Sequence, residues 1–246
     1  YLSSKVKRLR ARSIAVSSLT RDVIDDAYAL FEQSYADADR DRFERDLREK
    51  QRIILLRDGR SGALKGFSTV LIQRLTIPRA ATVIFSGDTV IHRDYWGQKQ
   101  LQVAFAKILL AEKLPPPARP LYWFLISKGY RTYMLLANAF PRAVPRYDRP
   151  DDPALRPLLD GLARARFGDA FDAAAGIVRA NGHERVREGL APVTRRHLAN
   201  PHVCFFVARN PRHGEGDELA CLADVRLVDI ARIAARLAVA RLRVRT

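Results

Sequence analysis

The sequence predicts an α/β protein of the α+β kind, in which helices flank a mixed, mostly antiparallel sheet. Its 246 residues are 48% apolar and 9% aromatic, enough to bury a substantial core. Residues 58–62 read Asp-Gly-Arg-Ser-Gly between two apolar runs, a turn composition typical of a β-hairpin. Apolar residues at helical spacing alternate with strand-like runs through the first half of the chain. These observations together favour a sheet covered by helices.

The amino-terminal part predicts one strand followed by two helices. A basic arm leads into a short strand at 13–18, and its cations are Lys5, Lys7, Arg8, Arg10 and Arg12. Thr20 is placed to cap a helix that runs to about Tyr35, because a threonine hydroxyl can accept the unpaired amides of a first helical turn. A second, strongly charged helix is expected from Asp41 to Lys50.

Strands and helices then alternate. The hairpin pairs a strand at 52–57 with one at 66–75. The elements expected after it are a strand at 82–91, a helix at 100–114, a strand at 121–126 and a helix that begins over 128–136. A polar loop at 92–99 joins the third of these strands to its helix.

The composition changes after residue 146, where prolines crowd a short span: Pro145, Pro150, Pro153 and Pro157. We therefore expect a core at 1–146, which includes the basic arm, and a mostly helical carboxy-terminal elaboration at 147–246. The sequence leaves open whether that elaboration is independent. Within it we predict a strand at 202–208 and a basic amphipathic helix that starts near 216–218.

A net charge of +16 favours an anionic partner. That partner could be a nucleic acid, an anionic membrane surface, a phosphate-bearing cofactor or an acidic carrier protein; ordinary solvated charge is the alternative. Nothing resembles a membrane span or a signal peptide, although the first residue is Tyr1. Cys204 and Cys221 have neither metal-ligand spacing nor a disulfide framework, so we expect a reducing cytoplasm and no metal.

One segment carries a resemblance to a known family. Residues 90–101 read Val-Ile-His-Arg-Asp-Tyr-Trp-Gly-Gln-Lys-Gln-Leu, which resembles the V-x-P-x-Y-R-G-x-G-x-G segment of GNAT acyltransferases. The order of elements over residues 13–140 is also similar to that family, which implies a GNAT-like fold. Trp96 stands where the family has arginine, and Lys99 and Leu101 stand where it has glycines.

The resemblance implies a donor site at this loop. In the family it cradles the pyrophosphate of acyl-coenzyme A, because a helix amino terminus offers unpaired N–H groups and the positive end of its dipole. The donor-binding residues are then Val90, Ile91, Gly97, Gln98, Lys99 and Gln100. Because two glycines are lost, three alternatives stay open: a shifted acyl-CoA mode, an acyl carrier protein thioester as donor, or a core without donor binding.

The resemblance also implies catalytic residues. Asp88 occupies the place on the fourth strand where many GNAT enzymes have an acidic general base, and His92 is a second candidate. Tyr133 is the better candidate for the general acid that protonates the leaving thiolate, although neither it nor Tyr130 has the usual spacing to Phe140. Each of these residues also has a plain structural alternative, as a turn, a solvated loop or a core aromatic residue.

The resemblance therefore implies an acyltransferase, in which an acyl group moves from a thioester to an amine or hydroxyl acceptor by direct attack. The competing class is a non-catalytic GNAT-fold adaptor or nucleic-acid-binding protein. It would use arginines of the amino-terminal arm and of the carboxy-terminal helix, namely Arg226, Arg232, Arg236, Arg241 and Arg243. No G-x-x-x-x-G-K-S/T, H-E-x-x-H or G-x-S-x-G motif is present. The acceptor, the acyl length and the oligomeric state stay undetermined.

Overall fold

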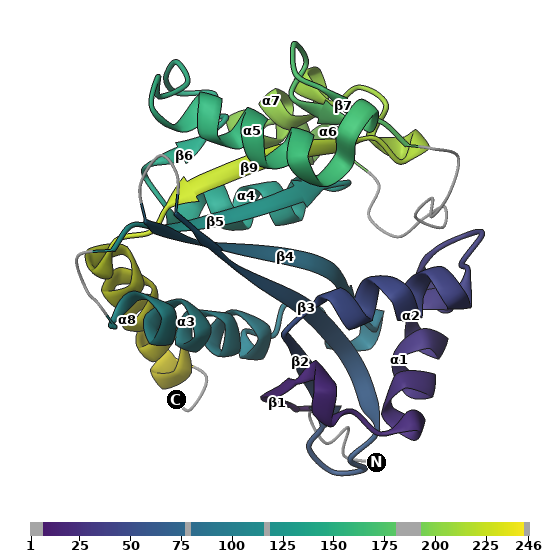
Figure 1. The fold of residues 1–246 in the computed structure, drawn as a ribbon. Helices are drawn as coiled ribbons and strands as arrows, with labels where there is room; N and C mark the ends of the chain where they lie inside the picture. The colour runs from purple at the N-terminus through teal and green to yellow at the C-terminus, as the bar shows by residue number, and fades with distance from the viewer. Residues whose placement is uncertain (1–6, 77–79, 116–118, 181–192, 244–246) are drawn as a thin grey trace.

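The computed structural model describes residues 7–76, 80–115, 119–180 and 193–243, with the side chains from 240 onward left out. Its strands form one sheet in the order β1-β2-β3-β4-β5-β9-β8-β7, with β6 paired to β9 (Figure 1). Among the strand pairs in the described part of the chain, only β4–β5 is parallel. The strands are β1 (Leu9–Ala15), β2 (Arg52–Asp58), β3 (Leu64–Leu75), β4 (Ala81–Ile91), β5 (Leu121–Ser127), β6 (Ala143–Val144), β7 (Phe171–Asp172), β8 (Ile177–Val178) and β9 (Glu218–Asp224).

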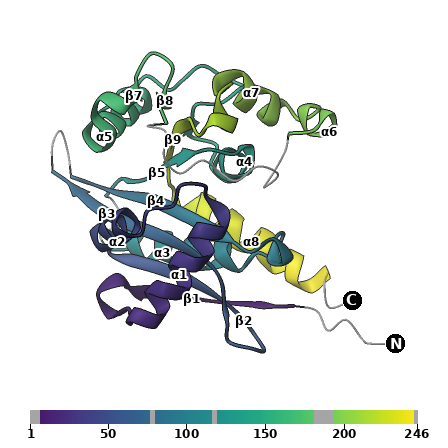
Figure 2. The same cartoon turned by 90° about the vertical axis from the view of Figure 1, so that its right-hand side faces the viewer.

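Helices cover both faces of this sheet (Figures 1 and 2). They are α1 (Arg21–Ser34), α2 (Arg40–Glu49), α3 (Gln100–Lys113), α4 (Tyr130–Ala139), α5 (Leu155–Phe167), α6 (Arg195–Leu198), α7 (Pro201–Arg209) and α8 (Leu227–Arg243). The apolar side of β2 and β3 packs against α1 and α2 around Phe31 and Phe67. α5 covers the same face further along, and α3, α4 and α8 cover the opposite one.

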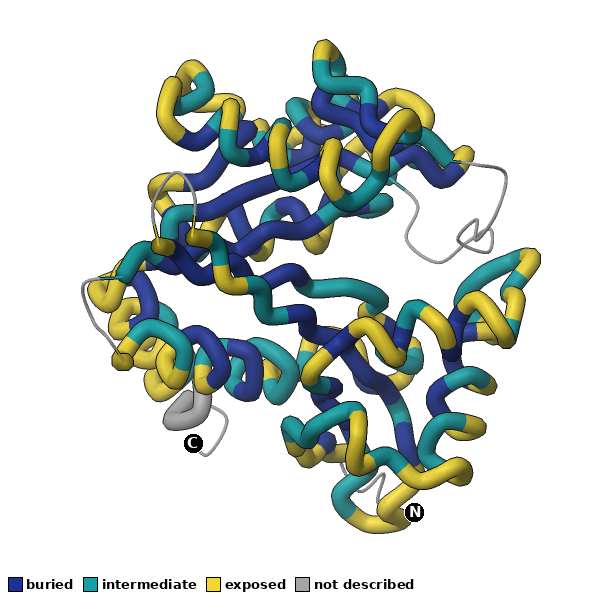
Figure 3. Tube along the Cα trace, viewed as in Figure 1, coloured by how far each residue is buried: buried dark blue, intermediate teal, exposed yellow. Residues whose placement is uncertain are grey.

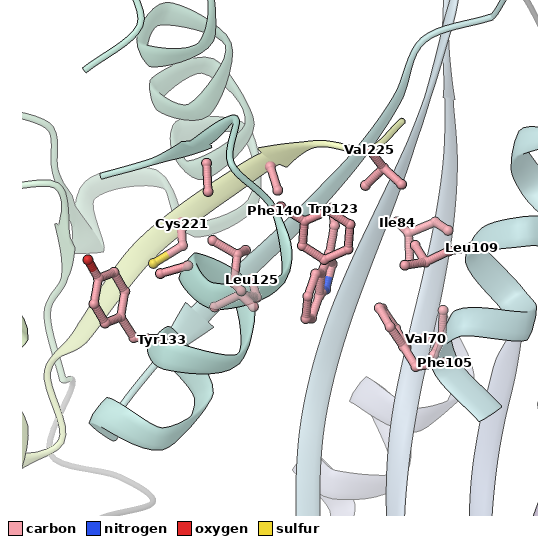
Figure 4. Close-up of a cluster of buried hydrophobic side chains, with 14 of the residues drawn as sticks. Val70, Ile84, Phe105, Leu109, Trp123, Leu125, Tyr133, Phe140, Cys221 and Val225 are labelled. Carbon is pink, nitrogen blue, oxygen red and sulfur yellow. The ribbon is translucent and has the colours of Figure 1, made fainter. Parts of the chain in front are cut away.

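The core follows the sheet. Figure 3 shows burial concentrated along the central strands, with exposed residues on the outer sides of the helices. On the α3 side the ring of Trp123 lies 4.7 Å from Phe105 and 5.5 Å from Phe140, centroid to centroid (Figure 4). These large aromatic contacts join α3 and α4 to the middle of the sheet.

The predicted fold class is confirmed: a mixed, mostly antiparallel sheet lies between helices. The strands and helices predicted between Thr20 and residue 136 are also confirmed, with ends that differ by a few residues. The first strand lies earlier than predicted, at Leu9–Ala15. Lys5 of the basic arm lies outside the described residues, and so do the side chains of Arg241 and Arg243.

Two predictions in the carboxy-terminal part are wrong. Residues 202–208 belong to helix α7, because Asn200 caps the helix by accepting the His202 amide at 2.9 Å and Pro201 fits its first turn. The helix expected from 216–218 begins only at Leu227, and β9 precedes it. The Leu-Ala-Cys-Leu-Ala run of β9 favours helix by composition, but burial between β5 and β8 overrides that preference.

β9 places the carboxy-terminal part inside the sheet. It pairs with β5 from Tyr122–Asp224 to Ser127–Leu219, and Leu219, Cys221 and Leu222 are completely buried. The segment 147–246 therefore adds three strands to the same sheet, as well as its helices.

We predict from this pairing that a chain ended after Arg146 does not fold cooperatively. It would leave β5 as an unpaired, apolar edge, and it would lose α5 and the β9 and α7 side chains that fill the core beside α4. Near-ultraviolet circular dichroism and thermal unfolding measure the outcome, with the whole chain and its expected cooperative transition as control. A soluble 1–146 fragment with a sharp transition of its own would contradict the prediction.

Candidate functional site

The most distinctive feature of the sheet is the divergence of β4 from β5. The two strands pair from Thr82–Leu121 to Ser86–Leu125, and beyond Ser86 β4 pairs with β3 alone within the described sheet. At this point the β3–β4 register shifts: Ser68 faces Thr89, and Val70 faces Ser86. Gly87 and Asp88 thus oppose a single residue of β3, which is a β-bulge and bends the strand. The result is an opening between β4 and the end of β5.

Backbone groups of β4 face this opening. The His92 amide donates to the Lys65 carbonyl at 2.8 Å. By alternation along the strand, the backbone N–H and C=O of Val90 bond to β3, and those of Thr89 and Ile91 point away from β3. The Ile91 carbonyl accepts the indole N–H of Trp96 at 2.7 Å. Of the two predicted strand residues, Ile91 therefore presents its amide to the opening, whereas Val90 is buried under α1 and α2.

The bulge is held from the α2 side. A Cβ added at Gly87 would lie 2.5 Å from Thr69 Oγ1 and 3.0 Å from Lys50 Cε, so only glycine allows this approach. The side chain of Lys50 is completely buried, and its ammonium is paired with Asp46 at 2.5 Å. Asp88, the predicted base, is half-buried at this bulge and so lies beside the opening.

The loop after β4 has the shape that its sequence predicted. Gly97 adopts φ +84°, and nothing lies within 4 Å of a Cβ added there, so the residue is free of neighbours on that side. His92 begins a short 3₁₀ turn (Arg93–Tyr95) by accepting the Asp94 amide at 3.3 Å. The His92 side chain therefore holds the local turn of this loop.

Gln98 and Gln100 differ in what their side chains do. Gln98 Oε1 accepts the Leu9 amide at 2.9 Å, and its Nε2 donates to the Lys7 carbonyl at 3.0 Å, so this side chain fastens the loop to the start of β1. Lys99 and Gln100 open α3, whose first amides have no partner within the helix. Because the Gln98 side chain is engaged in this way, only its backbone could contact an acyl donor.

A row of side chains that the sequence did not indicate lies across the mouth of the opening. The guanidinium of Arg131, on α4, lies 5.0 Å from the Trp96 ring centroid and 5.9 Å from that of Tyr130. The Tyr130 oxygen lies 3.3 Å from Nδ1 and 3.4 Å from Nε2 of His197 on α6. His197 is remote from the loop in sequence, and no local pattern could have identified it.

The structure places Tyr133 differently. It is completely buried, and its oxygen lies 3.5 Å from Nδ1 of His202 on α7. Burial, and then the neighbouring Cys221, raise the pKa of Tyr133 well above its ordinary value. Figure 4 shows Tyr133 on the far side of Leu125 from Ile84 of β4. The structure thus brings Tyr130, and not Tyr133, next to the loop that carries Trp96.

Asp58 ties the loop to the β2–β3 turn. Its Oδ1 accepts the amides of Arg60 and Ser61 at 3.1 and 2.8 Å, and its Oδ2 accepts the Tyr95 hydroxyl at 2.9 Å. The Ser61 amide, followed by the Tyr95 hydroxyl, holds the pKa of Asp58 well below its usual range. A hollow of about 620 Å³ adjoins this network, and Lys7, Arg8, Arg10 and Arg60 contribute to its wall.

The described residues include no cluster of three or more His, Cys, Asp or Glu side chains that could hold a metal ion. No helix in the described part of the chain is long and apolar enough to cross a membrane.

No protein-family model and no curated protein matches the chain, but solved structures resemble it. A GNAT family N-acetyltransferase from Escherichia coli in complex with CoA is 14% identical, over 55% of this chain and 73% of that one, with a TM-score of 0.38. A Trypanosoma brucei acetyltransferase is 18% identical, over 59% and 100%, with a TM-score of 0.39. A conserved protein of unknown function from Enterococcus faecalis is 12% identical over 52% of this chain, which spans only 32% of that protein, with a TM-score of 0.39.

The order and pairing of the elements agree with the GNAT-like fold that the sequence predicted: strand, two helices, three antiparallel strands, then helix, parallel strand and helix. The likenesses to solved structures concern the fold alone.

We predict that Asp58 stabilises the protein only while it is ionised. A depressed pKa in the folded state gives stability that is present above the unfolded pKa of about 3.9 and is lost as the pH falls. Asp58→Ala should lower the thermal midpoint at pH 7, and its difference from the wild type should shrink below about pH 4. Asp26→Ala on α1 is the control, because that exposed carboxylate has no hydrogen bond or ion pair among the described residues. A difference that does not change between pH 7 and pH 3 would contradict the role of the carboxylate.

Proposed function

We propose that this protein is an acyltransferase that moves an acyl group from a thioester donor to an amine or hydroxyl acceptor. The observation that carries the proposal is the opening between β4 and β5, which continues into a glycine turn and the free amino terminus of α3. A pantetheine arm contains amides that can pair with an open strand edge, and a pyrophosphate suits a helix amino terminus. Both features lie in sequence on one segment, as a single extended donor requires.

Arg131 supports acyl-CoA as the donor. The loop has Trp96 where the family segment has arginine, yet the Arg131 guanidinium lies over that indole ring at 5.0 Å. A positive charge is thus returned to the loop from α4, where it can pair with a phosphate. In this proposal Gly97, Lys99 and Gln100 supply backbone amides to the pyrophosphate, and Ile91 supplies an amide to the thioester carbonyl.

The reaction needs three groups. Asp88 takes a proton from the acceptor, directly or through water, while the nucleophile attacks the thioester carbon. The Ile91 amide stabilises the developing oxyanion, and the C–S bond then breaks. The leaving thiolate takes a proton from a tyrosine. We assign that role to Tyr130, since the Tyr133 hydroxyl is enclosed beneath α7.

His197 prepares Tyr130 for this role. Its Nδ1 accepts the Thr194 amide at 3.2 Å, which fixes the position of the ring. Both ring nitrogens lie near the Tyr130 oxygen, at 3.3 and 3.4 Å, and Arg131 Nε donates to the same oxygen at 3.5 Å. These contacts hold the Tyr130 hydroxyl beside the loop that carries Trp96.

A carrier protein thioester is the second donor to test. The net charge of +16 would attract an acidic carrier. The arginines of the α8 region, however, are engaged within the chain: Arg226 with Asp224 at 3.6 Å, Arg232 with Asp229 at 3.4 Å, and Arg236 with the Asn138 carbonyl at 3.2 Å. Free acyl-CoA therefore has the stronger support. If nucleic acid binds tightly with a steep salt dependence and no thioester binds, the protein is an adaptor instead.

We predict that Gly97→Val weakens acyl-CoA binding at least tenfold, about 1.4 kcal/mol, because a β-branched residue opposes the positive φ of the turn. Gly97→Asn is the matched control, since asparagine tolerates this backbone region and should keep the affinity within about threefold. Calorimetry with acetyl-CoA, a long-chain acyl-CoA and an acylated carrier protein identifies the donor. Equal affinities of both variants for the donor that binds would exclude the loop.

We predict that substitutions at the proposed acid and base separate chemistry from stability. Asp88→Asn should lower turnover on the order of 10²-fold at unchanged donor affinity, as for a lost general base. Tyr130→Phe should lower turnover at least tenfold, more for donors with poor leaving thiols, whereas Tyr133→Phe should affect mainly the thermal midpoint. Single-turnover kinetics measure these effects. A larger turnover loss in Tyr133→Phe than in Tyr130→Phe would return the role to Tyr133.

A further inference from the structure

A groove of about 550 Å³ lies between α3 and the outer strand β1, and it reaches the start of α3 at Gln100. Its walls carry small side chains where the helix faces the strand: Ala11 and Ser13 on β1, and Ala104 and Ala111 on α3. Side chains of this size leave the space between strand and helix unfilled. The volume is in the range of ligand-binding sites in proteins.

The strand beside this groove has unpaired backbone groups. β1 is the end strand of the sheet, and the Gly59 amide donates to the Arg8 carbonyl at 2.7 Å while the Val16 amide donates to the Gln51 carbonyl at 3.0 Å. By alternation, the even-numbered residues of β1 bond to β2, and the odd-numbered ones point outward. Ala11 and Ser13 therefore direct their amides away from the sheet, and no partner for those amides occurs in the described structure.

The rest of this edge is already closed by side chains. Gln98 accepts the Leu9 amide at 2.9 Å, Arg52 donates to the Ser13 carbonyl at 3.3 Å, and Ser18 donates to the Ala15 carbonyl at 2.7 Å. What remains is a short stretch centred on Ala11, with its carbonyl and the amides of Ala11 and Ser13. Its position coincides with the groove.

The groove is basic. Arg52 and Lys107 line it, and Lys107 is exposed on α3 with no ion pair among the described residues. The one carboxylate in the lining, Glu112, is bound by Arg74 at 2.5 Å, so it contributes little free negative charge. Outward strand amides next to two cations would suit an extended chain that carries carboxylates.

We propose that this groove binds an extended, acidic polypeptide segment of a partner protein, which adds to β1 as a further strand. Its backbone pairs with Ala11 and Ser13, its acidic side chains meet Arg52 and Lys107, and small apolar side chains enter the space beside Ala104. A second copy of β1 would be a poor occupant, because that strand is itself basic at Arg10 and Arg12 and like charges would face each other. The proposal does not depend on acyl transfer.

The test uses a panel of seven-residue peptides that alternate glutamate with alanine, valine or serine, together with lysine counterparts. We expect at least one acidic peptide to bind the whole chain with a Kd below about 100 μM and its lysine counterpart at least tenfold more weakly. Hydrogen exchange should then slow at the Ala11 and Ser13 amides. The amides of Arg10 and Arg12, which already bond within the sheet, should change little.

Matched variants locate the contact. Ala11→Pro removes one outward amide at an edge position where proline is tolerated, and Ala11→Thr keeps that amide. Affinity should fall at least tenfold in Ala11→Pro and in Lys107→Glu, and it should stay within about threefold in Ala11→Thr and in Arg164→Glu on α5. Circular dichroism checks that each variant folds, and the charge reversal remains informative if Ala11→Pro does not.

Three results would overturn the proposal: no acidic peptide binds at about 1 mM, the lysine peptides bind equally well, or the Ala11 and Ser13 amides stay unprotected in the bound state. Dimerisation that protects these amides, with no peptide binding, would show instead that a second copy occupies the groove. Because none of these measurements involves a thioester, their outcome is separate from that of the acyl-transfer experiments.

Discussion

The divergence of β4 from β5 is the constraint on which the rest of the molecule depends. It is fixed on both faces of the sheet at nearly the same place. On one face, Lys50 and Thr69 crowd against Gly87. On the other, the indole N–H of Trp123 donates to Ser86 Oγ at 3.0 Å, at the last residue that pairs with β5. The sheet is therefore joined up to Ser86 and separated after it, which leaves backbone groups of Thr89 and Ile91 facing the gap.

The elements around this gap come from distant parts of the sequence. The loop with Trp96 follows β4, Arg131 and Tyr130 begin α4, and His197 lies on α6. On the α1 side, Lys128 lies 4.9 Å from the Tyr35 ring centroid and pairs with Glu218 at 3.4 Å. Aromatic and cationic side chains thus border the gap on two sides, an arrangement that suits a ligand with both phosphate and apolar parts.

Local patterns predicted much of the fold and little of the candidate site. Turn composition identified the β2–β3 hairpin, and the glycine loop identified the start of α3, because both depend on neighbouring residues. The predicted helix from 216–218 is wrong where β9 lies, because burial between neighbouring strands overrides the helix-favouring composition of that segment. The Tyr130–His197 contact joins residues 67 apart in the chain, and the Arg131–Trp96 contact joins two different elements, so no short segment contains either.

The position of β9 has a consequence for folding during synthesis on the ribosome. β5 is made early, but the strand that covers its open side emerges only about 90 residues later, after α5, α6 and α7. During that interval the nascent chain carries an apolar strand with unpaired hydrogen-bonding groups, a state prone to association with other chains. Pairing of distant strands is slow because a long loop must close first. Synthesis in the cell should therefore be sensitive to chaperones that bind such edges, more than the stability of the finished fold would suggest.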